Sequence, residues 1–266
     1  MKIIEKYDLF IFDLDGVIYT GEKLINKANL IIEELKSRNK KIYYLTNNST
    51  KSRENFKNKL NKLEIFSEIN QIITSAYATA AFLNKNFKNE KKAFVIGQNG
   101  IKEELLKFNF EILKKFDKEN IANFVIVGLD QFFNYEKLAN GLHFLIKGSK
   151  FIATNDDPSL PTENLPLPGA GSMVKALEIC SGKKPLITIG KPNDFMINLI
   201  LEREQIRKNK AIIIGDRLRT DILAGINAKI DTLLVKTGSG EEELNNKTLN
   251  SIRPNYIKNS ISEILD

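Results

Sequence analysis

The stretch FIFDLDGVIY, residues 10–19, ends an apolar run with two carboxylates, Asp13 and Asp15, before a turn at Gly16. Ionised side chains are seldom buried without a partner, and two like charges this close repel each other. The pattern therefore predicts that a positive group sits between them. A calcium-binding EF-hand loop does not fit, because glycine falls at the fourth loop position instead of the sixth and Leu24 occupies the twelfth.

Further polar groups follow other apolar runs. They are Thr46-Asn47-Asn48, Gly190-Lys191-Pro192 and Gly215-Asp216-Arg217, with Asp221 one turn into the next segment. In open parallel sheets, ligands bind outside the carboxyl ends of the strands. No histidine or cysteine cluster accompanies these acids, and a set of oxygen ligands suits Mg²⁺. The sequence thus predicts a magnesium site built from distant stretches of chain.

Alternating apolar runs and amphipathic stretches predict the elements that position these groups. The predicted strands are 8–12, 41–45, 71–74, 93–96, 124–127, 151–153, 186–189, 211–214 and 232–235. The predicted helices include 27–37, 52–63, 135–146, 193–203 and 220–228. This alternation indicates an α/β protein with a doubly wound parallel sheet and helices on both faces.

Taken together, DLDG, TNNS, GKP and GDRLRTDI occur in the order of the four motifs of the haloacid dehalogenase (HAD) superfamily of phosphohydrolases. The chain resembles this superfamily over nearly its whole length. The PLPGAGS segment makes it similar to the subclass IIA branch, the NagD-like and nitrophenylphosphatase-type proteins. The resemblance implies a Rossmann-like HAD core with an inserted α/β cap of type IIA (C2).

The resemblance also implies roles for the two acids of the first motif. Asp13 matches the nucleophile, which would form an aspartyl-phosphate. Asp15 matches the general acid that protonates the leaving oxygen and then activates water. The implied Mg²⁺ ligands are a carboxylate oxygen of Asp13, the backbone carbonyl of Asp15 and Asp216, while Asp221 would orient a bound water or another ligand.

The remaining motifs match phosphate-binding groups. Thr46 and the amides of Asn47 and Asn48 would hold the phosphoryl oxygens, and Lys191 would offset their negative charge. Each of these groups has a simpler alternative role. Ser49 or Thr50 could cap a helix that starts near residue 52, and Lys191 could be a surface lysine. Asp216 could be a turn residue, and Asp221 an acid on a helix surface.

The resemblance divides the chain into residues 1–76 as the first part of the core, 77–181 as the cap and 182–266 as the second part of the core. In the cap, Asp156, Asp157 and the loop 165–172, with Gly169 and Gly171, are the expected substrate-facing parts. The alternative is a proline-rich structural loop over 153–172 with acids at turns, in which Ser172 caps the following helix.

Composition excludes several other classes. The net charge is +7 and the isoelectric point about 9.2, but the lysines are scattered as on solvated helix faces, so we expect no nucleic-acid partner. No apolar run is long enough to span a bilayer, so no membrane partner is expected. A single cysteine excludes an internal disulfide and, with no signal-peptide core, favours the cytoplasm.

The expected function is a Mg²⁺-dependent phosphomonoester hydrolase acting on a small phosphorylated metabolite through an aspartyl-phosphate. A sugar phosphate, a nucleoside monophosphate, phosphoglycolate or pyridoxal phosphate all fit the resemblance, as does a homodimer formed through the cap. The alternatives are a phosphomutase or phosphotransferase of the same superfamily and a basic nucleic-acid-binding protein without enzyme activity. A signalling receiver is disfavoured because it would be about half this length.

Overall fold

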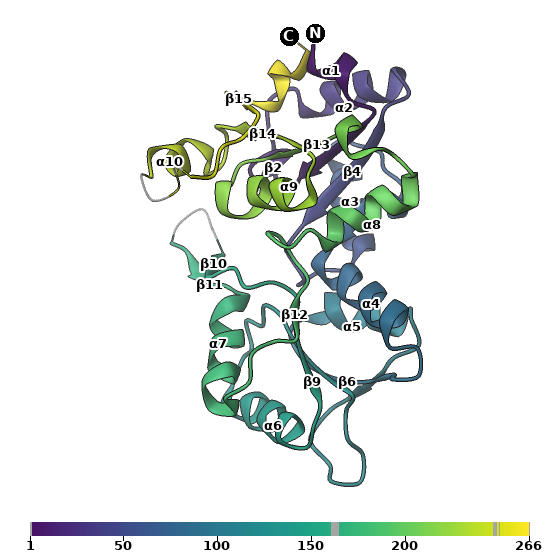
Figure 1. Ribbon diagram of the computed structural model, residues 1–266, viewed down its shortest axis with the longest axis vertical. Helices are drawn as coiled ribbons and strands as arrows, with labels where there is room; N and C mark the ends of the chain where they lie inside the picture. The colour runs from purple at the N-terminus through teal and green to yellow at the C-terminus, as the bar shows by residue number, and fades with distance from the viewer. Residues whose placement is uncertain (1, 161–164, 247–248, 250, 266) are drawn as a thin grey trace. The chain divides into compact units, whose positions relative to one another are not determined.

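The computed structural model describes residues 2–160, 165–246, 249 and 251–265 (Figure 1). The chain forms two compact units. The first comprises the residues up to Thr46, Phe56–Ile73 and the residues from Lys191 onward, and the second comprises Asn47–Asn55 and Thr74–Gly190. Part of the predicted proline-rich loop, residues 161–164, lies outside the described residues.

A six-stranded sheet forms the centre of the first unit, in the order β15-β14-β13-β1-β4-β5. The strands are β1 (Leu9–Asp13), β4 (Lys41–Thr46), β5 (Ile72–Thr74), β13 (Ala211–Gly215), β14 (Asp231–Val235) and β15 (Tyr256–Lys258). β1 runs parallel to β4 on one side and to β13 on the other. The strand order therefore reverses at β1, which is the switch point where ligands bind in doubly wound sheets.

Alternating side chains of the central strands pack on opposite faces of this sheet. Phe10 and Phe12 of β1 lie in one buried cluster with residues of α1 (Ile3–Lys6), α2 (Ala28–Ser37) and α3 (Arg53–Lys62). On the opposite face of the sheet, Gly225 of α9 (Leu223–Ala228) lies close to Thr232 and Ile213, and α8 (Phe195–Glu204) contacts α9. The predicted doubly wound α/β fold is confirmed.

Short elements complete the first unit. They are the hairpin β2 (Tyr19–Thr20) and β3 (Lys23–Leu24), η1 (Ile69–Gln71), η2 (Lys208–Lys210), the π-helical turn η3 (Leu218–Ile222), α10 (Gly240–Asn245) and η5 (Ile261–Leu265). The first and last of the described residues lie in this unit, where Lys2 Nζ donates a hydrogen bond to the Leu265 carbonyl at 3.3 Å.

The second unit is built on a five-stranded sheet of order β12-β9-β8-β6-β7, whose strand pairs are all parallel. Its strands are β6 (Lys92–Ile96), β7 (Glu111–Leu113), β8 (Phe124–Val127), β9 (Lys150–Ala153) and β12 (Ile187–Thr188). Its helices are α4 (Ser75–Asn86), α5 (Asn99–Leu106), α6 (Tyr135–Ile146) and α7 (Ala170–Ser181), and β10 (Ser159–Leu160) pairs with β11 (Leu167–Pro168).

The strand predicted at 186–189 differs from the expectation in its partner. Residues 182–266 are expected to form the second part of the core, but β12 pairs with β9 in the second sheet, with Ile187 opposite Ile152. The strand is short and only half-buried. Its hydropathy therefore could not predict which of the two sheets it joins. β7 and β15 were not predicted, because three-residue edge strands lack a clear period.

Among the described residues, no helix combines the length and the apolar character that crossing a bilayer requires.

A polar cluster at the start of β14 yields a prediction on stability. Asp231 accepts hydrogen bonds from Lys6 Nζ at 2.8 Å and from the hydroxyl of the fully buried Tyr7. Burial alone would raise the pKa of Asp231, but these hydrogen bonds outweigh it and lower the pKa. Asp231→Asn should therefore lower the free energy of unfolding at pH 7 by roughly 1 kcal/mol, measured by urea denaturation.

The pH dependence of this difference follows from the sign of the shift. Because the pKa is lower in the folded state, the stabilisation is present above the unfolded pKa of about 3.9 and is lost as the pH falls through the folded value. Combining the substitution with Lys6→Met gives the coupling between the two side chains. A difference that persists unchanged from pH 7 to pH 2.5 would contradict the assignment.

Candidate active site

Three buried aspartates lie together in the first unit. Asp13 ends β1, Asp216 directly follows β13, and Asp221 lies in the π-helical turn η3. One carboxylate oxygen of each lies within 4.8 Å of the others, a spacing that could hold a metal ion. Residues far apart in the sequence therefore meet at the carboxyl ends of adjacent strands, the position that open parallel sheets use for ligands.

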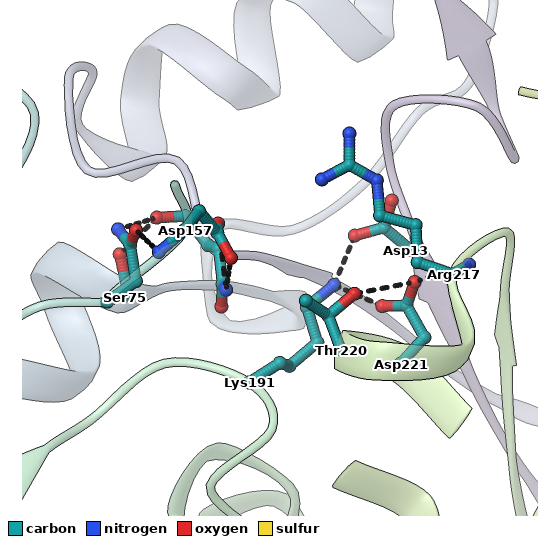
Figure 2. Close-up of polar contacts among 9 residues, drawn as sticks. Asp13, Ser75, Asp157, Lys191, Arg217, Thr220 and Asp221 are labelled. Atoms are coloured by element: carbon teal, nitrogen blue, oxygen red, sulfur yellow. Dashed lines mark hydrogen bonds and ion pairs between the residues drawn. The ribbon is translucent and has the colours of Figure 1, made fainter. Parts of the chain in front are cut away.

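The ammonium group of Lys191 lies between the carboxylates of Asp13 and Asp221 (Figure 2). Its Nζ donates to Asp13 Oδ1 and, at 2.5 Å, to Asp221 Oδ1. Asp221 is held further by its second oxygen, which accepts from the Arg217 backbone N–H at 3.2 Å. One ammonium balances only one of three carboxylates, so the cluster keeps a negative charge that a divalent cation would neutralise.

Burial is the largest influence on the pKa values of these groups, and their mutual charges come second. Burial, followed by the nearby charge of Asp221, raises the pKa of Asp216 to about 7. Burial also raises the pKa of Asp13, partly opposed by Lys191. For Lys191, burial lowers the pKa, but Asp13 and Asp221 outweigh it and raise the pKa overall, so the ammonium stays charged.

Two glycines let the backbone approach the Asp216 carboxylate. Gly16 and Gly238 have φ of +87° and +60°, and a Cβ on them would lie 2.4 Å and 2.2 Å from Asp216 Oδ2. The next N–H, that of Ser239, donates to the same oxygen at 2.8 Å. Gly238 and Ser239 are not among the residues predicted from the sequence. Their signal was the TGSG run, residues 237–240, which follows the strand 232–235 as the other motifs follow theirs.

Asp15 follows Asp13 by two residues, but unlike Asp13 it is exposed. The protein nevertheless partly desolvates its carboxyl group, and this raises its pKa, although Lys59 and Arg217 oppose the shift. Hydrogen bonds from the backbone of Gly21 and Gly16 also stabilise the ionised form. A carboxyl group with a raised pKa holds a proton more readily, as a general acid requires.

Thr46 lies at the end of the neighbouring strand β4 and is buried. Asp13 is opposite Leu45 in the register of β1 and β4, so Thr46 lies one residue beyond the position of Asp13. The structure thus places Thr46 and Asp13 at the same edge of one sheet.

The predicted residues that follow Thr46 belong to the second unit. The side-chain amide of Asn47 donates to both Asp157 oxygens, at 3.3 Å and 3.1 Å. The Asn48 side chain accepts from the N–H and the hydroxyl of Thr50 at 2.9 Å and 2.7 Å. The helix α3 begins at Arg53, so Ser52 directly precedes it instead of Ser49 or Thr50, and the Ser52 N–H and hydroxyl both donate to Asn55 Oδ1.

Gly169 and Gly171 pack against the chain that carries Asp157. A Cβ on Gly169 would lie 2.1 Å from the Asp157 carbonyl oxygen, and the Gly171 N–H donates to that oxygen at 2.9 Å. Close packing therefore accounts for both glycines. The alternative in which Ser172 caps the helix is wrong, since α7 begins at Ala170 with Gly169 as its N-cap.

Comparison with known proteins agrees with this geometry. A haloacid dehalogenase-like hydrolase model matches residues 10–111, and a HAD-hydrolase-like model matches residues 188–264. The chain is 35% identical to phosphoglycolate phosphatase 1A, chloroplastic, of Arabidopsis thaliana, over 99% of this chain and 78% of the relative. It is 34% identical to acid sugar phosphatase of Staphylococcus saprophyticus, over 98% of both.

The chain is also similar to solved structures of phosphatases. The 4-nitrophenylphosphatase of Thermotoga maritima matches with a TM-score of 0.90 and 31% identity, over 100% of this chain and 98% of the other. Glycerol phosphate phosphatase of Mycobacterium tuberculosis, in complex with magnesium, matches with a TM-score of 0.88 and 26% identity, over 100% of this chain and 78% of the other.

With 35% identity across almost its full length, the chain belongs to the haloacid dehalogenase-like hydrolases. Within that family it is a phosphatase of the NagD-like, type IIA branch, with its parallel α/β core and cap. It is a hydrolase that acts on phosphoric monoesters.

Proposed function

We propose that the protein hydrolyses small phosphomonoesters in a Mg²⁺-dependent reaction through an aspartyl-phosphate on Asp13. The observation that carries the proposal is the buried cluster of Asp13, Asp216 and Asp221 with Lys191 at the end of β1. Phosphoryl transfer asks a protein mainly for positioning and charge stabilisation, and this cluster offers a nucleophile beside a cation.

The roles of the other residues follow from the same chemistry. Asp13 Oδ attacks phosphorus, and Asp15 gives a proton to the leaving oxygen and later takes one from water. Thr46 and the N–H groups of Asn47 and Asn48 bind the phosphoryl oxygens. Lys191 stays charged and offsets the negative charge gathered around the reacting group.

The residues present fit a magnesium ion. The cluster is acidic, buried and composed of oxygen donors, and the lack of a Cβ at Gly16 and Gly238 leaves room for the Asp216 carboxylate beside them. Asp13, the Asp15 carbonyl and Asp216 would hold the ion, with Asp221 orienting a water or another ligand. When bound, the ion neutralises the phosphate charge that would otherwise repel the attacking carboxylate.

The substrate class is drawn from the relatives. Their names refer to phosphoglycolate, acid sugar, 4-nitrophenyl and glycerol phosphates. Because these substrates share only the phosphoryl group, we propose a small phosphorylated metabolite and a generic activity on aryl phosphates. We also propose that residues 77–181 act as a cap that excludes water, that the enzyme works in the cytoplasm, and that it dimerises through the cap.

The test is a phosphate-release screen over a panel of phosphomonoesters. With Mg²⁺, we expect turnover of 4-nitrophenyl phosphate and of at least one metabolite. Excess chelator should abolish phosphate release, and added Mg²⁺ should restore it. Release that continues undiminished in chelator would refute the metal assignment.

Two parallel assays separate the alternatives. A phosphomutase would convert a sugar phosphate without releasing phosphate, and a nucleic-acid-binding protein would show a salt-dependent affinity for DNA or RNA without turnover.

A further inference from the structure

The carbonyl group of Asn47 is held by two donors of the second unit. Ser75 Oγ donates to it at 2.6 Å, and Asn155 Nδ2 donates at 2.8 Å. Ser75 opens α4, and Asn155 follows β9 by two residues. Both side chains are buried, so neither hydrogen bond is easily replaced by one to water.

The side chain of Asn47 is held as well. Its amide donates to the Asp157 carboxylate, whose backbone N–H in turn donates to Asn155 Oδ1 at 3.2 Å. Gly190 closes the site, because a Cβ there would lie 2.7 Å from Asn47 Oδ1. We call Ser75, Asn155 and Asp157 the Asn47 clamp; Ser75 and Asp157 are labelled in Figure 2.

The clamp fixes the direction of one N–H group. The peptide bond between Asn47 and Asn48 is planar, so the Asn47 C=O and the Asn48 N–H lie in one plane and, in the trans form, point in opposite directions. Two donors on the carbonyl oxygen therefore set the orientation of the Asn48 N–H. A donor that is fixed before the substrate arrives needs no reorganisation during the reaction.

We propose that Ser75, Asn155 and Asp157 are positioning residues for phosphate binding, acting through Asn47 to orient the Asn48 N–H. This rests on the proposed function, in which that N–H binds a phosphoryl oxygen. It also changes the role expected for Asp157: its carboxylate is engaged by Asn47, so it supports the binding of the group that all substrates share instead of selecting the leaving group.

The chain supplies a matched control. Thr79 is a second buried residue of α4, and its hydroxyl donates to the Ser75 carbonyl at 2.7 Å without touching Asn47. Ser75→Ala and Thr79→Val each remove one buried hydroxyl from the same helix. Asn155→Leu removes the other donor at similar size and without adding charge, and it provides a second test should Ser75→Ala fail to fold.

The test compares kcat/KM for 4-nitrophenyl phosphate and for phosphoglycolate with inhibition by inorganic phosphate, in the Mg²⁺-loaded enzyme. We expect Ser75→Ala and Asn155→Leu to lower both kcat/KM values by the same factor, roughly tenfold, and to weaken phosphate inhibition comparably. Asp157→Asn should likewise leave the ratio of the two substrates unchanged. Thr79→Val should keep wild-type phosphate inhibition.

Two outcomes overturn the inference. One is phosphate inhibition in Ser75→Ala and Asn155→Leu as strong as in Thr79→Val. The other is a change of more than a few-fold in the ratio of the two substrates, which would return Asp157 to a role in specificity. Failure of the proposed function is recognised separately, because the wild-type enzyme would then release no phosphate from any substrate.

Discussion

Asp13→Asn should reduce phosphate release from 4-nitrophenyl phosphate by about 10⁴-fold or more, because removal of a nucleophile leaves only the catalysis due to binding. The amide is almost the same size as the carboxylate, so the buried end of β1 should keep its packing. The substitution Asp13→Asn also removes one negative charge from a cluster of three carboxylates and one ammonium. Folding should therefore be retained while turnover is lost.

Asp8→Asn is the matched control for that experiment. Asp8 directly precedes the same strand, is exposed, and lies 3.6 Å from Lys40 in a surface ion pair. Exposed pairs of this kind contribute little to stability, so kcat and the unfolding midpoint should stay close to wild type. Activity retained in Asp13→Asn, with a chemically verified Asn at that position, would show that another group attacks phosphorus.

Lys191→Met should lower kcat by roughly 10²- to 10³-fold, about 3–4 kcal/mol in the activation barrier, since it removes a fixed charge beside the reacting group. The same change leaves Asp13 and Asp221 without their shared donor. The metal-free protein should then lose stability because like charges repel inside a buried site. Added Mg²⁺ should recover part of that loss.

The measurements for Lys191→Met are kcat with saturating Mg²⁺ and the thermal unfolding midpoint with Mg²⁺ and with chelator. Lys184→Met, at an exposed lysine seven positions earlier, removes the same charge from the surface and should change neither. A kcat within threefold of wild type would exclude Lys191 from the charge stabilisation.

Most of the first unit could be predicted from the sequence because the patterns that indicate its strands are local. The apolar runs before Asp13, Thr46 and Asp216 are long and fully buried, and each ends at a polar group, so strand type and strand end could both be predicted. The meeting of Asp13, Asp216 and Asp221 followed from the rule on carboxyl ends of parallel strands. This rule predicts that the three carboxylates lie close together without any knowledge of the distances between them.

The features that could not be predicted from the sequence depend on contacts between distant segments. The sheet to which β12 belongs is decided by its hydrogen bonds to β9, and nothing in PLITIG distinguishes that partner. The Asn47 clamp likewise joins residues far apart in the chain, and each of its members has an ordinary alternative role. Gly238 was missed because small residues after a strand usually form only a turn.

The position of β1 has a consequence for how the chain is made. β4 leaves the ribosome soon after β1, but β13, on the other side of β1, follows only after the whole of residues 74–190. Until then a hydrophobic strand keeps an open edge, which is a template for pairing with other nascent chains. A chain interrupted before Lys191 carries Asp13 but not Lys191, Asp216 or Asp221, so premature termination should yield a product that is prone to aggregation and keeps one acid of the three.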